Sequence, residues 1–177
     1  MTIYELGEKK PEIAPTAYVH PQASVIGDVK IGEGVFVAPM ASIRGDRGRI
    51  EIGDETNVQD GAVIHSEPRF VTRIGRRVNI GHNATIHAEL VDDNAAIGMG
   101  AVLMLGSKVA KGVLIANSAL LHSKTVTEPN KIYAGVPAKY MRDLDPSGDA
   151  RRAIDDYLDS YVESTKTYRK DIRKIDD

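Results

Sequence analysis

The chain has 177 residues, a formal net charge of −2 and a sequence pI near 6.2. This length suits one domain with a sizeable core, and this charge gives no bulk attraction to nucleic acid or to an anionic membrane. Cysteine is absent, which excludes disulfides and thiolate ligands and leaves His, Asp, Glu or backbone oxygens to hold any metal.

The first ten residues lack the apolar run of a signal peptide. No later segment approaches the roughly 20 apolar residues of a membrane span. We therefore expect a cytoplasmic protein with neither a membrane nor a nucleic-acid partner.

Beyond the first ten residues, aliphatic side chains recur at every sixth position, with two loops and two five-residue steps between the runs. An amphipathic helix would repeat at three to four residues, so the period favours short strands separated by tight turns. A small or β-branched residue usually stands two places earlier, and glycine often follows, as turns require. The pattern predicts a β-helix rather than a sandwich of ordinary strands. The series is Ile13, Val19, Val25, Ile31, Val37, Ile43, Ile52, Val58, Ile64, Ile74, Ile80, Ile86, Val91, Ile97, Leu103, Val109, Ile115, Leu121, Val126 and Ile132.

Over residues 11 to 137 this pattern resembles the hexapeptide-repeat left-handed β-helix, in which three hexapeptides make one triangular coil. The left hand is implied by the resemblance alone, because ordinary crossover connections are right-handed. We therefore expect a mainly β fold, with a single-stranded left-handed parallel β-helix domain over 1–137. A linker and a C-terminal helix packed on the β-helix are expected over 138–177.

The hexad pattern stops near Asp145, and the segment from Pro146 to Ile172 changes to helical spacing. Apolar residues at three- and four-residue steps predict an amphipathic helix whose apolar face lies on the flank of the β-helix. Ser147 or Asp149 is expected to cap its start. The residues predicted for the apolar face are Ile154, Tyr157, Leu158, Tyr161, Val162, Thr165 and Ile172.

Stacking the hexads in threes brings distant histidines together. Since adjacent coils lie about 4.8 Å apart, His65 and His87 are predicted to be neighbours able to share a metal ion. His82 follows a different side of the triangle, next to Asp60, so a threefold-related neighbour would have to bring it into the same site. The residues that directly follow one corner of the triangle on successive coils are predicted to stack in a column. They are Arg44, His65, His87, Met104 and His122.

The motifs around these histidines resemble the γ-class carbonic anhydrase family. In that family the residues matching His65, His82 and His87 hold a metal across the interface of a homotrimer, two from one chain and the third from its neighbour. The resemblance therefore implies one Zn, or Fe or Co, per chain at the subunit interface. The matching segments are 44–46, 57–65, 81–87, 97–101 and 134–139.

The resemblance also implies roles for other residues. Gln59 hydrogen-bonds the metal-bound water or hydroxide, while Arg44, Asp46 and Asp60 pair charges at the interface and orient the ligands. Tyr161, on the predicted helix, corresponds to a family tyrosine near the metal. Zinc in a three-imidazole site lowers the pKa of bound water from 15.7 to about 7. The implied activity is the reversible hydration of CO2 to bicarbonate.

The sequence departs from the family at the acidic residues that carry the proton of the metal-bound water to solvent. In the best-studied branch a Glu follows the Arg-x-Asp motif and an acidic loop follows the first metal histidine. Here these places hold Arg47 and a short basic loop containing Arg69 and Arg73, in which Glu67 is the only acid and the candidate substitute. Two alternatives remain: an acyl-CoA thioesterase or acyltransferase on the same scaffold, and a non-catalytic metal-binding assembly subunit.

Overall fold

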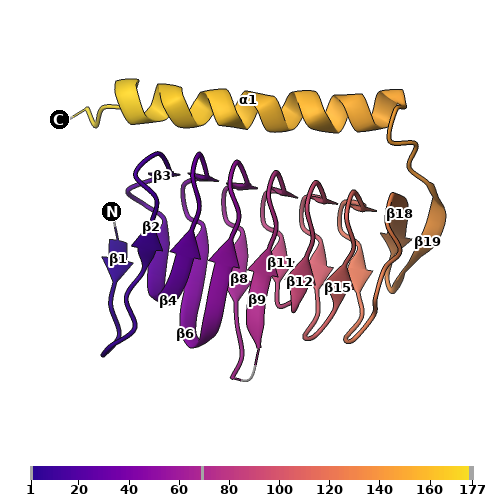
Figure 1. Ribbon diagram of the computed structural model, residues 1–177, viewed down its shortest axis with the longest axis horizontal. Helices are drawn as coiled ribbons and strands as arrows, with labels where there is room; N and C mark the ends of the chain where they lie inside the picture. Colours follow the sequence, from indigo (N-terminus) through magenta and orange to yellow (C-terminus); the bar gives the residue numbers. More distant parts are fainter. Residues whose placement is uncertain (1, 69, 176–177) are drawn as a thin grey trace.

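The computed structural model describes residues 2–68 and 70–175 as a parallel β-solenoid with one long helix alongside it (Figure 1). Met1, Arg69, Asp176 and Asp177 lie outside the described residues. Short strands alternate with tight turns, and the strands of the coils pair in parallel with strands one coil away. The predicted left-handed β-helix with a C-terminal helix is confirmed. No helix in the described part of the chain is long and apolar enough to cross a membrane.

The solenoid has three faces, formed by two sheets. An 8-stranded sheet lies under the helix, and its strands are β3 (Tyr18–Val19), β5 (Phe36–Val37), β7 (Asn57–Val58), β10 (Asn79–Ile80), β13 (Ala96–Ile97), β16 (Leu114–Ile115), β18 (Lys131–Gly135) and β19 (Ala138–Asp143).

An 11-stranded sheet supplies the other two faces. We call the first of them the β8 face; it holds β8 (Val63–His65), β11 (Thr85–Ile86), β14 (Val102–Leu103) and β17 (Leu120–Leu121). The next face holds β2 (Glu12–Ile13), β9 (Val71–Ile74), β12 (Leu90–Val91) and β15 (Lys108–Val109). The long strands β4 (Ser24–Ile31) and β6 (Ser42–Ile52) bend through the corner and pair on both faces, and β1 (Thr2–Tyr4) pairs with the start of β4.

Branched aliphatic side chains fill the narrow interior. The predicted corner column is in register along the coils and fully buried, which confirms the grouping of hexads in threes. Because each coil offers one such side chain per face, the core needs few aromatic residues. The column consists of Ile43, Ile64, Ile86, Leu103 and Leu121.

The last coil corrects the predicted series. Val126 is 65% exposed, whereas Thr127 is buried at the inward position that continues the six-residue step. Tyr133, rather than Ile132, then joins the core cluster. Both polar groups are satisfied, because the Thr127 hydroxyl accepts the amide of residue 110 at 2.9 Å and the Tyr133 hydroxyl accepts the amide of residue 128 at 3.0 Å. The period therefore stays six, and the assumption of a purely aliphatic series is wrong here.

The helix α1 (Asp149–Asp171) starts later than predicted. Its N-cap is Gly148, without a side-chain cap, so the prediction of Ser147 or Asp149 as the cap is wrong. The Ser147 hydroxyl instead donates to Asp145 at 2.8 Å.

The helix lies along the solenoid in Figure 1, over the 8-stranded sheet. Its buried residues are Arg151, Leu158 and Thr165, whereas Tyr157 is exposed. The predicted Ile172 lies just past the helix end and is also exposed.

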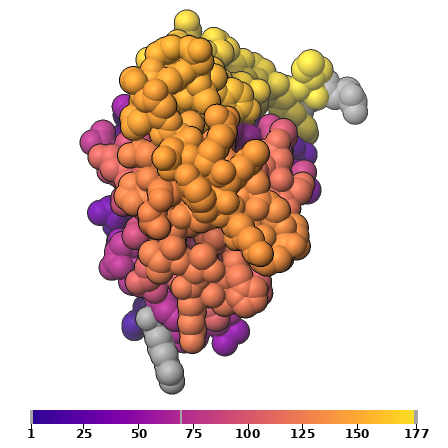
Figure 2. All heavy atoms as spheres, turned by 90° about the vertical axis from the view of Figure 1, so that its right-hand side faces the viewer, coloured from indigo at the N-terminus to yellow at the C-terminus, as the bar shows by residue number. Residues whose placement is uncertain are grey.

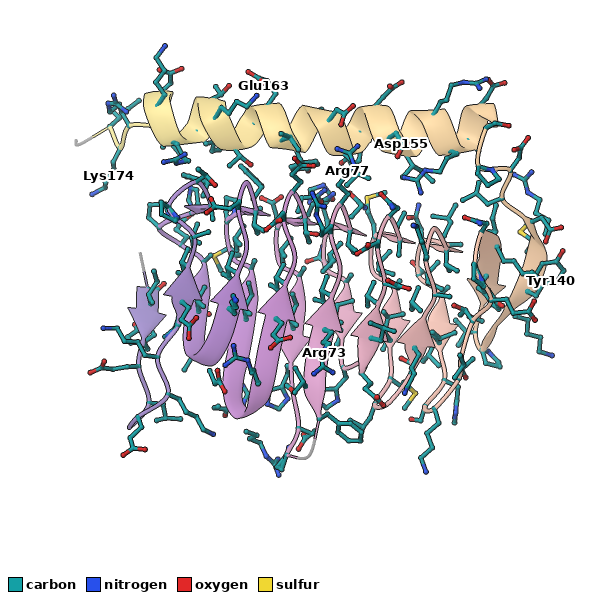
Figure 3. All side chains as sticks on the ribbon, in the orientation of Figure 1. Arg73, Arg77, Tyr140, Asp155, Glu163 and Lys174 are labelled. Carbon is teal, nitrogen blue, oxygen red and sulfur yellow. The ribbon has the colours of Figure 1, made fainter. Side chains whose placement is uncertain are left out.

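Strands β18 and β19 pair antiparallel after the last coil. Figure 2 looks along the solenoid from this end and shows residues in the orange part of the colour scale over its upper and middle parts, with salmon-coloured residues of the preceding coils below them. Residues 138–143, for which the sequence predicts a linker, thus extend the sheet. Figure 3 places Tyr140 at the same end and Arg77 in the layer between the solenoid and α1.

Candidate metal centre

The first edge of the candidate centre joins two histidines on adjacent coils. β8 ends at His65, and His87 directly follows β11, whose register places Ile86 beside Ile64. His65 Nδ1 and His87 Nε2 are 3.1 Å apart, and the two rings stack with centroids 5.1 Å apart. The predicted adjacency of these two side chains is confirmed.

Asp46 fixes which ring nitrogen of His65 is free. Asp46 Oδ1 lies 3.1 Å from His65 Nε2, and its Oδ2 accepts a 2.6 Å hydrogen bond from Arg44. If Nε2 carries the proton donated to Asp46, Nδ1 keeps its lone pair and points toward His87. Burial raises the pKa of Asp46, but the hydrogen bonds from Arg44 and His65 outweigh it, and the net shift is downward.

Glu67 brings a third ligand atom to this edge. Its Oε1 lies 3.6 Å from His87 Nε2 and 3.9 Å from His65 Nδ1. Its other oxygen, Oε2, lies 3.3 Å from Nε of Arg47. Within the described residues, His65, Glu67 and His87 form the group whose possible ligand atoms all lie within 4.8 Å of one another.

The three ligand atoms fit a divalent metal ion. Bonds of about 2.0–2.2 Å place tetrahedral ligands roughly 3.3–3.6 Å apart, close to the separations at this edge. Two facing nitrogen lone pairs at 3.1 Å also need a proton or a cation between them. Burial and the charge of His65 lower the pKa of His87, which favours the neutral imidazole that binds metal.

His82 lies elsewhere in the same chain. It follows β10, on the sheet under the helix, and its Nδ1 is 3.0 Å from Asp60 Oδ2. If Nδ1 carries the shared proton, Nε2 is left as the ligand atom. The predicted pairing of the Asp60 and His82 column is confirmed, and His82 is not part of the His65–His87 group.

A buried amide network holds Gln59, which directly precedes Asp60, the partner of His82. Gln59 is 1% exposed, and its Nε2 donates to Asn57 Oδ1 at 2.9 Å and to Asn79 Oδ1 at 2.7 Å. Asn79 is itself oriented, because its Nδ2 donates to the carbonyl of Ile97 at 3.4 Å. Both donors of the Gln59 amide are therefore used, and Oε1 is the atom left for the cavity that Gln59 lines.

Two adjoining cavities, each of about 310 Å³, lie between α1 and the solenoid. Gln59 lines the first, Asp60 and Tyr161 line the second, and Tyr157 lines both. Tyr161 packs on Phe36 with ring centroids 5.4 Å apart, and burial raises its pKa. The structure thus groups Tyr161 with Asp60, rather than with His65 and His87 of the same chain.

Sequence reasoning did not identify Asn57, Asn79 or Tyr157 as site residues. The asparagines were detectable, because they occupy one repeat position, in register between Phe36 and Ala96 under the helix. Polar residues at buried, otherwise apolar positions indicate a hydrogen-bonding role. No sequence signal reports that Arg47 pairs with Glu67.

Comparison with known proteins adds three relatives, while no family model matches the chain. The chain is 35% identical over 144 residues to carnitine operon protein CaiE of Proteus sp., covering 81% of this chain and 73% of that protein. It is 38% identical over 149 residues to gamma carbonic anhydrase 2, mitochondrial, of Arabidopsis thaliana, covering 81% and 54%. A solved structure from Bacillus cereus, provisionally described as an acetyltransferase, is similar with a TM-score of 0.90 at 31% identity, covering 95% and 96%.

Proposed function

The chain belongs to the γ-class carbonic anhydrase-like family of hexapeptide-repeat proteins, and we propose on this premise that it hydrates CO2 reversibly at a metal centre between subunits of a homotrimer. The observation that carries the proposal is the division of the site into two half-sites. One half-site is the His65–His87 edge, and the other contains His82 and Gln59.

The two half-sites flank the β8 face of the solenoid. His65 and His87 lie where strands of this face end, whereas His82 lies in the turn that leads into β11 of the same face. A neighbouring subunit turned about a threefold axis would bring its His82 edge against the His65–His87 edge. Val63, on this face between the two edges, is 39% exposed in the single chain, as expected for a surface that a neighbour covers.

Residues of the chain itself orient the ligand atoms of each half-site. Asp46 holds His65 with Nδ1 free, and Asp60 holds His82 with Nε2 free. The hydrogen bonds to Asn57 and Asn79 leave Gln59 Oε1 free as an acceptor, so that it can accept a hydrogen bond from the attacking water and orient that water's lone pair toward CO2. A divalent metal bound by the histidines would supply the Lewis acid that makes hydroxide available near neutral pH.

A CO2 hydration assay tests this function. Purified, metal-loaded protein is expected to hydrate CO2, with a rate that rises with the concentration of imidazole buffer. The reason is that Arg47 occupies the position of the family's proton-exporting acid, and positioned acid–base transfer is worth roughly 10²–10⁴-fold.

Substituting Gln59→Ala should lower kcat/KM, because Gln59 acts on the nucleophile rather than on proton export. Gln22→Ala, at an exposed position, is the matched control and should leave kcat/KM unchanged. Absence of hydration at every buffer concentration, in metal-loaded oligomer, would reject the proposal.

The cavity beside Gln59 favours acyl transfer or thioester hydrolysis as the second candidate. Apolar side chains of Ile97, Met99 and Tyr157 line its wall, and its volume of about 310 Å³ is in the range of small-ligand pockets. The likeness to the Bacillus cereus structure points the same way. Turnover of an acyl-CoA by protein that is inactive toward CO2 would support this candidate instead.

A further inference from the structure

We propose that Glu67 is itself a metal ligand, so that a single chain carries a His65–Glu67–His87 site, and that Arg47 competes with the metal for this carboxylate. The inference rests on the proposed metal centre but is independent of CO2 hydration. It adds a carboxylate to the three-histidine set and makes metal binding by one chain possible without His82 of a neighbour.

The geometry of one chain already forms this site. The three ligand atoms are separated by 3.1, 3.6 and 3.9 Å. A metal ion roughly 2.1 Å from each atom fits among them, as in the two-histidine, one-glutamate sites of catalytic zinc proteins. The side chains of His65 and Glu67 are 14% and 21% exposed, which limits competition from solvent. His82 is turned away toward Asp60 and contributes nothing within the chain.

Arg47 holds the other oxygen of the same carboxylate. Its side chain is 57% exposed and lies 3.3 Å from Glu67 Oε2, a partly solvated ion pair of the kind that is usually weak. A carboxylate with one oxygen toward the histidines and the other toward Arg47 is poised between two partners. The balance between these partners sets how many protein ligands the metal has.

This balance has a chemical consequence in the assembled protein. With His82 of a neighbouring subunit in place, Glu67 as a further ligand gives four protein ligands, which is the closed arrangement of structural zinc sites. With Glu67 drawn to Arg47, three histidines remain and one position is open for water. Arg47 therefore favours the open site, although it stands at the position where the family has the Glu that exports protons.

The chain contains a matched control one coil further on. Glu67 stands two residues after His65, and Glu89 stands two residues after His87. The carboxylate of Glu89 pairs with Lys108 at 2.8 Å, and it is not in the group of possible ligand atoms. Glu89→Gln thus removes an equivalent acid without touching the proposed ligand set.

Titration of the full-length protein with Co2+, followed by its visible absorption and by chelator competition, tests the proposal. In a His82→Ala background one Co2+ per chain should still bind. Adding Glu67→Gln should weaken it by more than the roughly 10–100-fold that loss of an outer-shell partner costs. Adding Glu89→Gln should have no effect. Adding Arg47→Gln should tighten Co2+ binding, since it frees the carboxylate, and should shift the absorption spectrum.

Two results would overturn the proposal. One is Co2+ affinity and absorption that are the same in His82→Ala with and without Glu67→Gln. The other is complete loss of Co2+ binding in His82→Ala under conditions in which the wild-type protein binds Co2+ normally. Circular dichroism of each variant separates these results from misfolding. Glu67-dependent Co2+ binding by protein that never hydrates CO2 would reject the proposed function and leave this inference standing.

Discussion

Replacing Arg151 with alanine should loosen the first turns of α1 from the solenoid. Arg151 is 6% exposed, and its guanidinium donates a 2.7 Å hydrogen bond to the carbonyl of Asn94, in a corner of the coil below. It also pairs with Asp155 one turn along the helix. These contacts make Arg151 a buried polar anchor between α1 and the solenoid, in addition to the ion pair of Arg77 with Asp159.

The expected cost follows from these contacts. Hydrogen bonds to charged groups are worth about 1.5–3 kcal/mol when buried, whereas Asp155 is 42% exposed and water can replace its partner at little cost. We therefore expect Arg151→Ala to lower the free energy of opening α1 by about 2 kcal/mol. Since about 1.4 kcal/mol is a factor of ten, the helix amides should exchange hydrogen about 30-fold faster.

Hydrogen exchange measured on α1 and on the solenoid strands checks this prediction. Coils in a solenoid contact only their neighbours, so exchange in strands far from Asn94 should change little. Arg152→Ala is the control, because Arg152 is 63% exposed and its pair with Asp149 is on the surface. Equal acceleration of helix exchange in both variants would refute the assignment of Arg151 as the anchor.

Two further predictions concern the part of strand β6 that holds Asp46 beside His65. The pKa of Asp46 lies below its ordinary 3.8, so its stabilising contribution is complete above pH 3.8 and is lost as the pH falls through the lowered folded-state value. The difference in thermal midpoint between wild type and Asp46→Asn should therefore be present at pH 6 and shrink at pH 3, and a constant difference would contradict this. Gly45→Ala should lower the thermal midpoint and weaken Co2+ binding, because the new Cβ would lie 2.4 Å from the carbonyl oxygen of Asp28. Gly34→Ala, whose nearest contact is 3.6 Å, should cost only the roughly 1–2 kcal/mol of a left-handed residue and leave Co2+ binding intact.

The sequence by itself determined the solenoid and which residues lie side by side on adjacent coils. A sustained period of six permits one inward side chain per strand, and stacking then fixes which residues lie side by side. For this reason the adjacency of His65 with His87, and of His82 with Asp60, was predictable from position alone. The resemblance to a known family supplied the left hand of the coil and the proposed chemistry.

Only the tertiary structure decided where side chains at the ends and edges point. Thr127 and Tyr133 continue the period inward because hydrogen bonds satisfy their hydroxyls, which no hydrophobicity pattern reveals. Arg151 is buried for the same reason, through a carbonyl far away in sequence. Likewise the pairing of Arg47 with Glu67 depends on how two long, flexible side chains leave neighbouring coils. Periodicity fixes the backbone position of each residue, but the direction of a polar side chain depends on the partners that the completed fold brings within hydrogen-bonding distance.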